Sequence, residues 1–423
     1  DKRIATDNPY GDMNGDDSPE LCVARLPADS AEEVENFFAK VINYENNTDF
    51  AAWRRDVHIV AGVGGFGALA DSVIEMTTRR FLSDRIPGWS RLTMTQASTG
   101  SHYCPDPWRF SEACINRMNQ GGMFWVYIGH GHVRTLDYVK AGEEYLPIFN
   151  EQHLPAIKSK HPPIAVFLAC YTGAFDAVQD SLAERLTLNP NGPIASIAAS
   201  RVSGPYGLAT MSDGMLRYCY EQRIPTLGEV LVESKRRMLK PANPEDSSNS
   251  QMQMIESIAK ALSPEDYDLM AERREHVWQM HLIGDPLISM RYPKVFELES
   301  PSRTEPGQSI KVRGVSTMRG KLTLEFGYRR AKVQRELDQV PVALDTQTGR
   351  DAFQERYQRA NDRTLVRVEG QIEAGPFEQE IQLPDELSNG RYRIRAYIAG
   401  ESDWQAGYRE FTVRRPRKQP SEQ

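Results

Sequence analysis

A histidine and a cysteine stand where two apolar segments of the sequence stop. His130 and Gly131 come just after the segment Met123–Ile128, and Cys170 comes directly after Ile164–Ala169. A thiol with a pKa of about 8.5 is only a few per cent thiolate at neutral pH, and the thiolate is the nucleophile. A neighbouring imidazole raises that fraction and can protonate a departing amine. The pair therefore suits nucleophilic attack on the carbonyl carbon of an amide.

Backbone amides near the same residues can bind the oxygen that becomes negatively charged during such an attack. Gly131 has no Cβ to block approach to its N–H, and the N–H of Cys170 lies beside the nucleophile. Loss of one donor of this kind typically lowers turnover by about 10²- to 10³-fold. We therefore expect Gly131 and Cys170 to form an oxyanion hole.

A parallel sheet is needed to bring His130 and Cys170 together. Through the first two thirds of the chain, apolar segments alternate with amphipathic ones, a pattern typical of an α/β domain with a mainly parallel sheet flanked by helices. The predicted strands are Leu21–Ala24, Val57–Ala61, Leu92–Thr95, Met123–Ile128, Ile164–Ala169 and Ile194–Ala198. The predicted helices are Ala31–Tyr44, Ala68–Leu82, Phe110–Met118, Ala177–Leu188 and Met211–Glu221, then stretches at 226–240, 251–261 and 265–281. Neighbouring strands lie about 4.8 Å apart, and sites form outside the carboxyl ends of parallel strands, so the two side chains should reach one substrate carbonyl.

The segments around these residues resemble the gingipain family of cysteine peptidases. The main motifs are Gly129-His130-Gly131 and Leu168-Ala169-Cys170-Tyr171-Thr172-Gly173-Ala174-Phe175-Asp176. Further similar segments are Tyr10-Gly11-Asp12, Arg25-Leu26-Pro27-Ala28, Ala199-Ser200-Arg201 and Leu282-Ile283-Gly284-Asp285-Pro286, so the resemblance covers about residues 7–290. It implies a caspase-like fold and an endopeptidase with His130 and Cys170 as its dyad. It also implies that the amides of Gly131 and Cys170 form the oxyanion hole and that catalysis requires no cofactor.

The resemblance also raises the question of cleavage specificity. The best-known gingipains cleave after arginine or lysine by means of an acidic residue in the substrate pocket. Asp71, Asp84 and Asp106 are the candidates for that acid in this sequence. His132 stands where a small or polar residue is expected.

The loop after the predicted strand Ile194–Ala198 is the neighbour of the cysteine loop. Its position predicts that Ser200, Arg201 and Tyr206 wall the substrate pocket. A plain connecting loop is the alternative.

The sequence pattern changes near Pro293. From there to about Val413 it alternates between apolar and polar residues, as in 309–312, 321–325, 365–368 and 392–397. We predict a peptidase domain at 1–292, an all-β immunoglobulin-like sandwich at 293–415 and a basic tail at 416–423.

Three other functions compete with peptide hydrolysis. His130 and His132 match the His-x-His pattern of metal-dependent hydrolases, but Asp137 is too distant in sequence for the commonest version. The segment 62–67 matches G-x-G-x-x-G between a strand and a helix, although no acid follows the next predicted strand as dinucleotide binding requires. The third alternative is a catalytically silent caspase-like scaffold whose β domain mediates adhesion or assembly.

Acidic and polar side chains alternate near the start of the chain. They are Asp12, Asn14, Asp16, Ser18 and Glu20. Oxygen ligands of this kind suit Ca²⁺, and a structural calcium site is expected, with a polar surface turn as the alternative. The loop is not an EF-hand, because Asp17 stands at the sixth position in place of Gly and Val23 at the twelfth in place of Glu.

The overall composition limits the partners. The chain has 423 residues and a formal net charge of −7, so we expect no nucleic-acid partner. The resemblance to gingipains implies protein or peptide substrates. No segment has the roughly 20 apolar residues that span a bilayer, and five cysteines are too few for a disulfide scaffold. By its resemblance to gingipains, the chain is expected to act outside the cytoplasm, secreted or at the cell surface.

Overall fold

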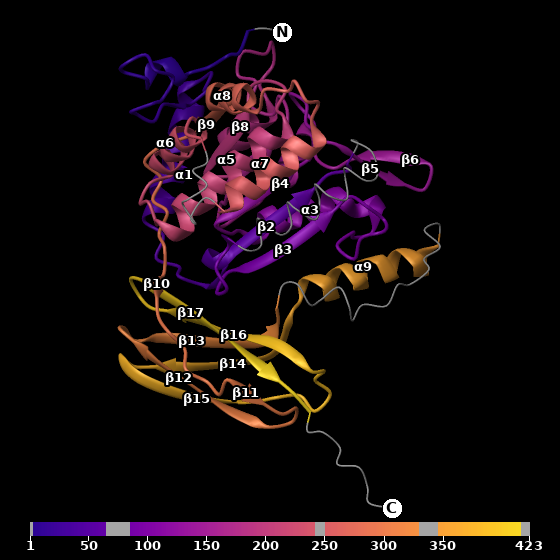
Figure 1. Ribbon diagram of the computed structural model, residues 1–423, viewed down its shortest axis with the longest axis vertical. Helices are drawn as coiled ribbons and strands as arrows, with labels where there is room; N and C mark the ends of the chain where they lie inside the picture. The colour runs from indigo at the N-terminus through magenta and orange to yellow at the C-terminus, as the bar shows by residue number, and fades with distance from the viewer. Residues whose placement is uncertain (1–2, 65–84, 242–249, 330–345, 416–423) are drawn as a thin grey trace, which may run out of the picture.

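The computed structural model describes residues 3–64, 85–241, 250–329 and 346–415, which form an α/β part followed by a mainly β part (Figure 1). The α/β part is built on a seven-stranded sheet with the order β1-β9-β8-β7-β4-β2-β3. Its strands are β1 (Ala24–Arg25), β2 (Asp56–Ala61), β3 (Arg91–Gln96), β4 (Phe124–Ile128), β7 (Ile164–Leu168), β8 (Ala195–Ala199) and β9 (Met280–Ile283). Every neighbouring pair is parallel except β8 and β9, so the expected mainly parallel sheet is confirmed.

Helices cover both faces of this sheet. Among the described residues, the α-helices of this part are α1 (Ala31–Glu45), α3 (Phe110–Gln120), α4 (Leu182–Leu188), α5 (Pro205–Leu216), α6 (Leu227–Met238), α7 (Ser250–Leu262) and α8 (Leu269–Gln279). The apolar side chains of β7 alternate between two cores because successive residues of a strand point to opposite faces. Val166 and Leu168 pack in the core formed with α1, α5, α6 and α8, whereas Ala165 and Phe167 pack in the core formed with α3 and α4.

Several short elements complete the α/β part. They are the hairpin β5 (Tyr138–Ala141) and β6 (Glu144–Pro147), the 3-10 helices at Asn8–Tyr10, Ala52–Arg55, Pro107–Arg109 and Glu151–Ala156, and a π-helix at Arg217–Glu221.

Some boundaries differ from the sequence-based expectations. The helix expected at 177–188 begins only at Leu182, where Ser181 and Glu184 form a capping box. The helix expected to run to residue 281 ends at Gln279, and the next four residues pair with β8 as β9. The helix expected at 68–82 lies outside the described residues.

The β part has two sheets that share one core. Its strands are β10 (Lys294–Val295), β11 (Arg303–Thr304), β12 (Ser309–Ser316), β13 (Gly320–Tyr328), β14 (Thr364–Ile372), β15 (Gly375–Gln382), β16 (Gly390–Ala399) and β17 (Trp404–Val413). Strands β12 and β15 form one sheet, and the other six form the second. Side chains from both sheets, such as Val312 and Leu324, belong to the same apolar cluster. A domain rich in β-strands is therefore present, while the immunoglobulin-like assignment stays a prediction.

A helix within the β part was not expected. Helix α9 (Gln347–Asn361) begins at the N-cap Thr346 and buries Phe353, Tyr357 and Ala360 at helical spacing. The prediction of strands alone between 293 and 413 was therefore wrong. Figure 1 shows α9 lying between the two parts of the chain, beside β3.

Strand β3 is the last strand of the sheet, and α9 contacts its outer edge, where a further strand could otherwise pair. The Asn361 side chain accepts a hydrogen bond from the Met94 amide (2.7 Å) and donates one to the Met94 carbonyl (2.9 Å). The Gln96 amide donates to the Tyr103 carbonyl (2.9 Å), and the Tyr357 hydroxyl bonds that of Thr95 (2.8 Å). The outer edge of β3 is thus covered.

A buried cluster of charges also joins the two parts. Glu325 on β13 pairs with Arg55 from the α/β part at 2.8 Å, and both side chains are almost fully buried. Arg367 and Arg395 lie 3.0 and 3.3 Å from the same carboxylate. Burial alone would raise the pKa of Glu325, but the three guanidinium charges lower it to about 2.

This cluster predicts a loss of stability in acid. Because the folded-state pKa of Glu325 lies below the ordinary value of 4.5, its contribution is complete above about pH 4.5 and is lost as the pH falls towards 2. The loss is expected to be on the order of 3 kcal/mol. Urea unfolding at a series of pH values should show this dependence in the parent and a flatter one in Glu325→Gln. Glu373→Gln, which removes an exposed ion pair in the same domain, should behave like the parent.

Candidate active site

His130 and Cys170 leave the sheet at the same level on neighbouring strands. Strands β4 and β7 are parallel, and Ile128 is paired with Leu168. The amide of Gly129 continues the pairing by donating to the Leu168 carbonyl (3.3 Å). His130 and Cys170 each stand two residues beyond that matched pair, and both are half-buried. The imidazole and the thiol therefore belong to adjacent loops at one edge of the sheet.

Gly131 allows these two loops to touch. A Cβ at this position would lie 2.7 Å from the Cys170 carbonyl oxygen and 2.8 Å from side-chain carbons of Ala169 and Thr172. Such distances are too short for any larger residue without a shift of the backbone. The glycine is thus required by the close approach of the histidine loop to the cysteine loop.

The cysteine loop contains a strained residue. Tyr171 has φ 58°, in the left-handed region that non-glycine residues seldom occupy. Its amide donates to the Arg201 carbonyl (3.1 Å), and the Gly173 amide donates to the Ala199 carbonyl (2.9 Å). The end of β8 therefore holds the turn that follows Cys170.

The loop after β8 also reaches the sulfur. The amide of Ser203 donates to Cys170 Sγ at 3.3 Å, and the Ser203 carbonyl oxygen lies 3.8 Å from the same sulfur. Sequence analysis did not single out Ser203, because the group that acts is a backbone amide with no side-chain signature. The Cys170 sulfur therefore faces both the N–H and the carbonyl oxygen of Ser203.

The three residues predicted to wall a substrate pocket have other contacts. Ser200 is buried and donates to the Ala5 carbonyl (2.7 Å), and Arg201 pairs with both carboxylate oxygens of Asp176 (2.8 and 2.6 Å). Tyr206 packs in a buried cluster from helices α5, α7 and α8. Ser200 and Arg201 thus fix the loops around Cys170, and the role of these three residues in substrate binding stays a prediction.

Of the candidate specificity acids, only one lies in the described part of the chain. Asp106 is buried, accepts a hydrogen bond from the Trp108 amide (3.1 Å) and pairs with Arg350 of α9 (2.9 Å). Its carboxylate therefore serves the contact between the two parts. Asp71 and Asp84 lie outside the described residues.

The predicted calcium loop brings three carboxylates together. Oxygen atoms of Asp12, Asp16 and Glu20 lie within 4.8 Å of one another, and this is the one such acidic or histidine-containing group found among the described residues. Neither His130 nor His132 belongs to it. Asp12 also accepts hydrogen bonds from backbone amides of the loop, including Gly15 (2.8 Å), and Asn14 donates to Glu20 (2.9 Å). Carboxylate oxygens fit a calcium ion. Ser18, which was also predicted as a ligand, contacts Asp16 through its backbone amide.

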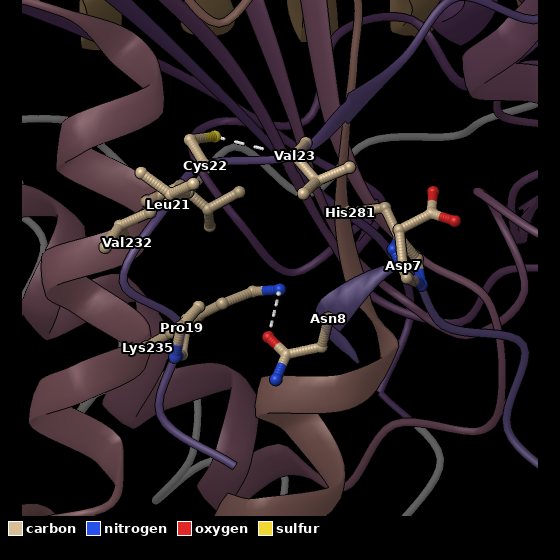
Figure 2. A pocket seen from close by; sticks show the side chains of 10 residues that line it. Asp7, Asn8, Pro19, Leu21, Cys22, Val23, Val232, Lys235 and His281 are labelled. Atoms are coloured by element: carbon tan, nitrogen blue, oxygen red, sulfur yellow. Dashed lines mark hydrogen bonds between the residues drawn. The ribbon is translucent and has the colours of Figure 1, made fainter. Parts of the chain in front are cut away.

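A small pocket between the start of the chain, α6 and β9 was not predicted (Figure 2). Ten residues line it: Asp7, Asn8, Pro19, Leu21, Cys22, Val23, Leu231, Val232, Lys235 and His281. The Lys235 ammonium donates to the Asn8 side chain (3.3 Å), and burial lowers the pKa of Lys235 to about 8. The ring of His281 contacts Phe175 of the cysteine loop (4.9 Å between centroids), and Cys170 is not among the residues that line the pocket.

Residues 2–291 match the family model of Peptidase family C25. The chain belongs to this family. It is therefore a cysteine-type peptidase, a hydrolase, as its resemblance to gingipains predicted. No protein with a curated description matches the chain.

Solved structures were also compared with the chain. The complex of the pro- and mature domains of Porphyromonas gingivalis RgpB is 16% identical with a TM-score of 0.49, and the match covers 97% of this chain and 81% of that chain. The Arg-specific cysteine proteinase gingipain R is 16% identical with a TM-score of 0.48, covering 97% and 79%. A structure described as a protease is 14% identical with a TM-score of 0.50, covering 97% and 78%. Together with the family, the architecture confirms a caspase-like α/β core followed by a β domain. No helix in the described ranges is long and apolar enough to cross a membrane.

The hydrogen bond from the Ser203 amide to the Cys170 sulfur should affect the rate at which Cys170 is alkylated. Ser203→Pro removes the N–H that faces the sulfur, whereas Ser203→Ala keeps it. Since a hydrogen bond to a charged group contributes roughly 1.5 kcal/mol, alkylation of Cys170 by iodoacetamide at neutral pH should slow about tenfold in the proline variant only. Equal rates in the two variants, at matched melting temperatures, would contradict the role of this amide.

Proposed function

We propose that this peptidase hydrolyses peptide bonds with Cys170 as the nucleophile and His130 as its proton-transfer partner. The observation that supports this most is the in-register pairing of β4 with β7. It places His130 and Cys170 two residues beyond the matched pair Ile128–Leu168. The Ser203 amide at 3.3 Å from the sulfur adds a donor to the thiolate.

The chemistry proceeds in two stages. The Cys170 thiolate attacks the carbonyl carbon of the peptide bond, and the oxygen takes up the negative charge beside the amides of Gly131 and Cys170. When the carbon–nitrogen bond breaks, the His130 imidazolium gives its proton to the departing amine and a thioester remains. His130 then takes a proton from water, the hydroxide attacks the thioester, and the acid leaves with regeneration of the thiolate.

A matched set of cysteine variants tests this proposal. All five cysteines are free, and burial raises the pKa of Cys22 to about 11 and those of Cys104 and Cys219 to about 12. A peptide carrying a thiol-reactive electrophile should therefore label one site at neutral pH. Labelling and peptide cleavage should both be lost in Cys170→Ala and retained in Cys22→Ala, with melting temperatures close to that of the parent.

The same experiment addresses the alternative of a catalytically silent scaffold. A scaffold would give no adduct on Cys170, and retained proteolysis in Cys170→Ala would exclude this residue as the nucleophile. Profiling the parent with a peptide library would define the residue preferred before the cleaved bond. The arginine preference in the name of one similar structure makes basic residues the first to test.

We also propose that the chain acts outside the cytoplasm on proteins or peptides and not on nucleic acid. Its membership of family C25 and its formal net charge of −7 support this.

We further propose that the loop with Asp12, Asp16 and Glu20 binds calcium in a structural role. The convergence of three carboxylates supports it, because calcium takes six to eight oxygen ligands and compensates their mutual repulsion. Calcium would contribute no step to the chemistry, which the side chains and amides around Cys170 carry out.

Calcium should therefore change stability and not reactivity. Adding calcium after chelation should raise the melting temperature of the parent by a few degrees, because a ligand that binds only the folded chain stabilises it. Glu20→Gln should weaken this response, while Glu35→Gln, an exposed carboxylate on α1, should leave it intact. An unchanged melting temperature in the parent would count against a calcium site.

A further inference from the structure

A buried tyrosine connects the histidine loop to the loop that follows it. The side chain of Tyr127, on β4, is fully buried in the core between the sheet and α3 and α4. Its hydroxyl donates to the His130 carbonyl (2.8 Å) and accepts a hydrogen bond from the Asp137 amide (3.3 Å). One oxygen atom thus fixes the backbone of two residues seven positions apart.

Two glycines make room for that oxygen. A Cβ on either Gly62 or Gly129 would lie 2.7 Å from the Tyr127 hydroxyl. The Gly62 amide meanwhile donates to the Ile128 carbonyl (2.8 Å), so the turn after β2 lies directly against the histidine loop. The first glycine of the apparent G-x-G-x-x-G motif is therefore required by a tyrosine hydroxyl.

The carboxylate of Asp137 is held in place by backbone donors on both oxygens. The Val63 amide donates to Oδ2 (3.2 Å), and the Tyr138 amide donates to Oδ1 (2.8 Å). The turn after β2 thus directs an amide at a carboxylate of the protein itself, where a dinucleotide site would direct it at a phosphate. Segment 65–67 of the motif lies outside the described residues.

Among the described residues, the charges that act on Asp137 are those of two histidines. Burial raises the pKa of Asp137, and the charges that His130 and His132 can carry lower it. Within the described ranges, no lysine or arginine pairs with this carboxylate. A half-buried carboxylate without a basic partner interacts more strongly with a nearby imidazolium than an exposed one, because the local dielectric constant is lower.

We propose that Asp137 is a positioning residue for His130, with Tyr127 fixing the distance between them. The carboxylate stabilises the imidazolium that must stand beside the Cys170 thiolate, and the hydroxyl keeps the two loops together. This inference rests on the proposed function and gives two residues outside the proposed dyad a part in its chemistry.

The pH dependence of Cys170 alkylation by iodoacetamide tests it, because a small probe needs no substrate pocket. Its acid limb reports formation of the Cys170 thiolate, which a neighbouring imidazolium stabilises. In Asp137→Asn, that limb should move to higher pH by about 0.5 to 1 unit, since the negative charge that stabilises the imidazolium beside the thiolate is gone. The kcat for a cleaved peptide should fall about tenfold or more with KM within a few-fold of the parent. Asp137→Glu should restore the limb towards the parent position.

Tyr127→Phe tests the positioning of the two loops separately from the charge of Asp137. This variant keeps the carboxylate but removes the hydroxyl, so the limb should stay in place while kcat falls several-fold. Glu144→Gln, an exposed carboxylate on the neighbouring hairpin, should match the parent in both measurements.

The outcomes distinguish this inference from the proposed function. If iodoacetamide and the peptide electrophile leave Cys170 unmodified in the parent, the proposed function fails. If the parent reacts but the limb of folded Asp137→Asn does not move, the proposed function stands and Asp137 has only a structural role. Asp137 would also have only a structural role if alkylation slowed equally at every pH in Asp137→Asn and Asp137→Glu, with the limb of the pH profile unshifted.

Discussion

The pairing of β4 with β7 is the constraint on which the candidate site depends. Parallel strands in register deliver their next residues to one edge of the sheet, and here the pair Ile128–Leu168 places His130 and Cys170 equally far beyond it. The pairing holds because both strands are buried between two layers of helices, with alternate side chains in different cores. A slip of one residue would move every side chain of a strand to the wrong face. The positions of the two reactive groups are therefore set by the packing of residues that take no part in the chemistry.

Around this pair, the neighbouring loops supply the remaining contacts. The loop after β8 holds the strained turn at Tyr171 and brings the Ser203 amide to the sulfur. The turn after β2 lies against the histidine loop, with the Tyr127 hydroxyl between them. Strands β8 and β2 flank the central pair on either side, so four adjacent strand ends contribute to one site.

The sequence was sufficient to predict the central strands, and the candidate residues His130 and Cys170 lie just beyond their ends. Phe124–Ile128 and Ile164–Leu168 are almost entirely apolar, as buried parallel strands are, and each is followed by a candidate catalytic residue. Strand β9 was missed because its apolar residues continue the pattern of α8, and only pairing with β8 makes them extended.

The contacts that were missed have no local signature. The amide of Ser203 could belong to any residue, and Asp137 becomes relevant only when the chain folds back to Val63 and Tyr127. Helix α9 did show a signal, since Phe353 and Tyr357 are four residues apart behind the cap Thr346. Its polar composition and its place among alternating strands obscured that signal.

The side chain of Asn361 has a consequence for how copies of the protein can associate. An uncovered edge strand offers a row of amides and carbonyls that another chain can use to extend the sheet, which is a common route to aggregation. Here the backbone groups of Met94 are bonded to a side-chain amide, and the Gln96 amide is bonded to Tyr103. A second molecule could add a strand at β3 only by first detaching α9, so the β domain protects its neighbour from edge-to-edge polymerisation at this side of the sheet.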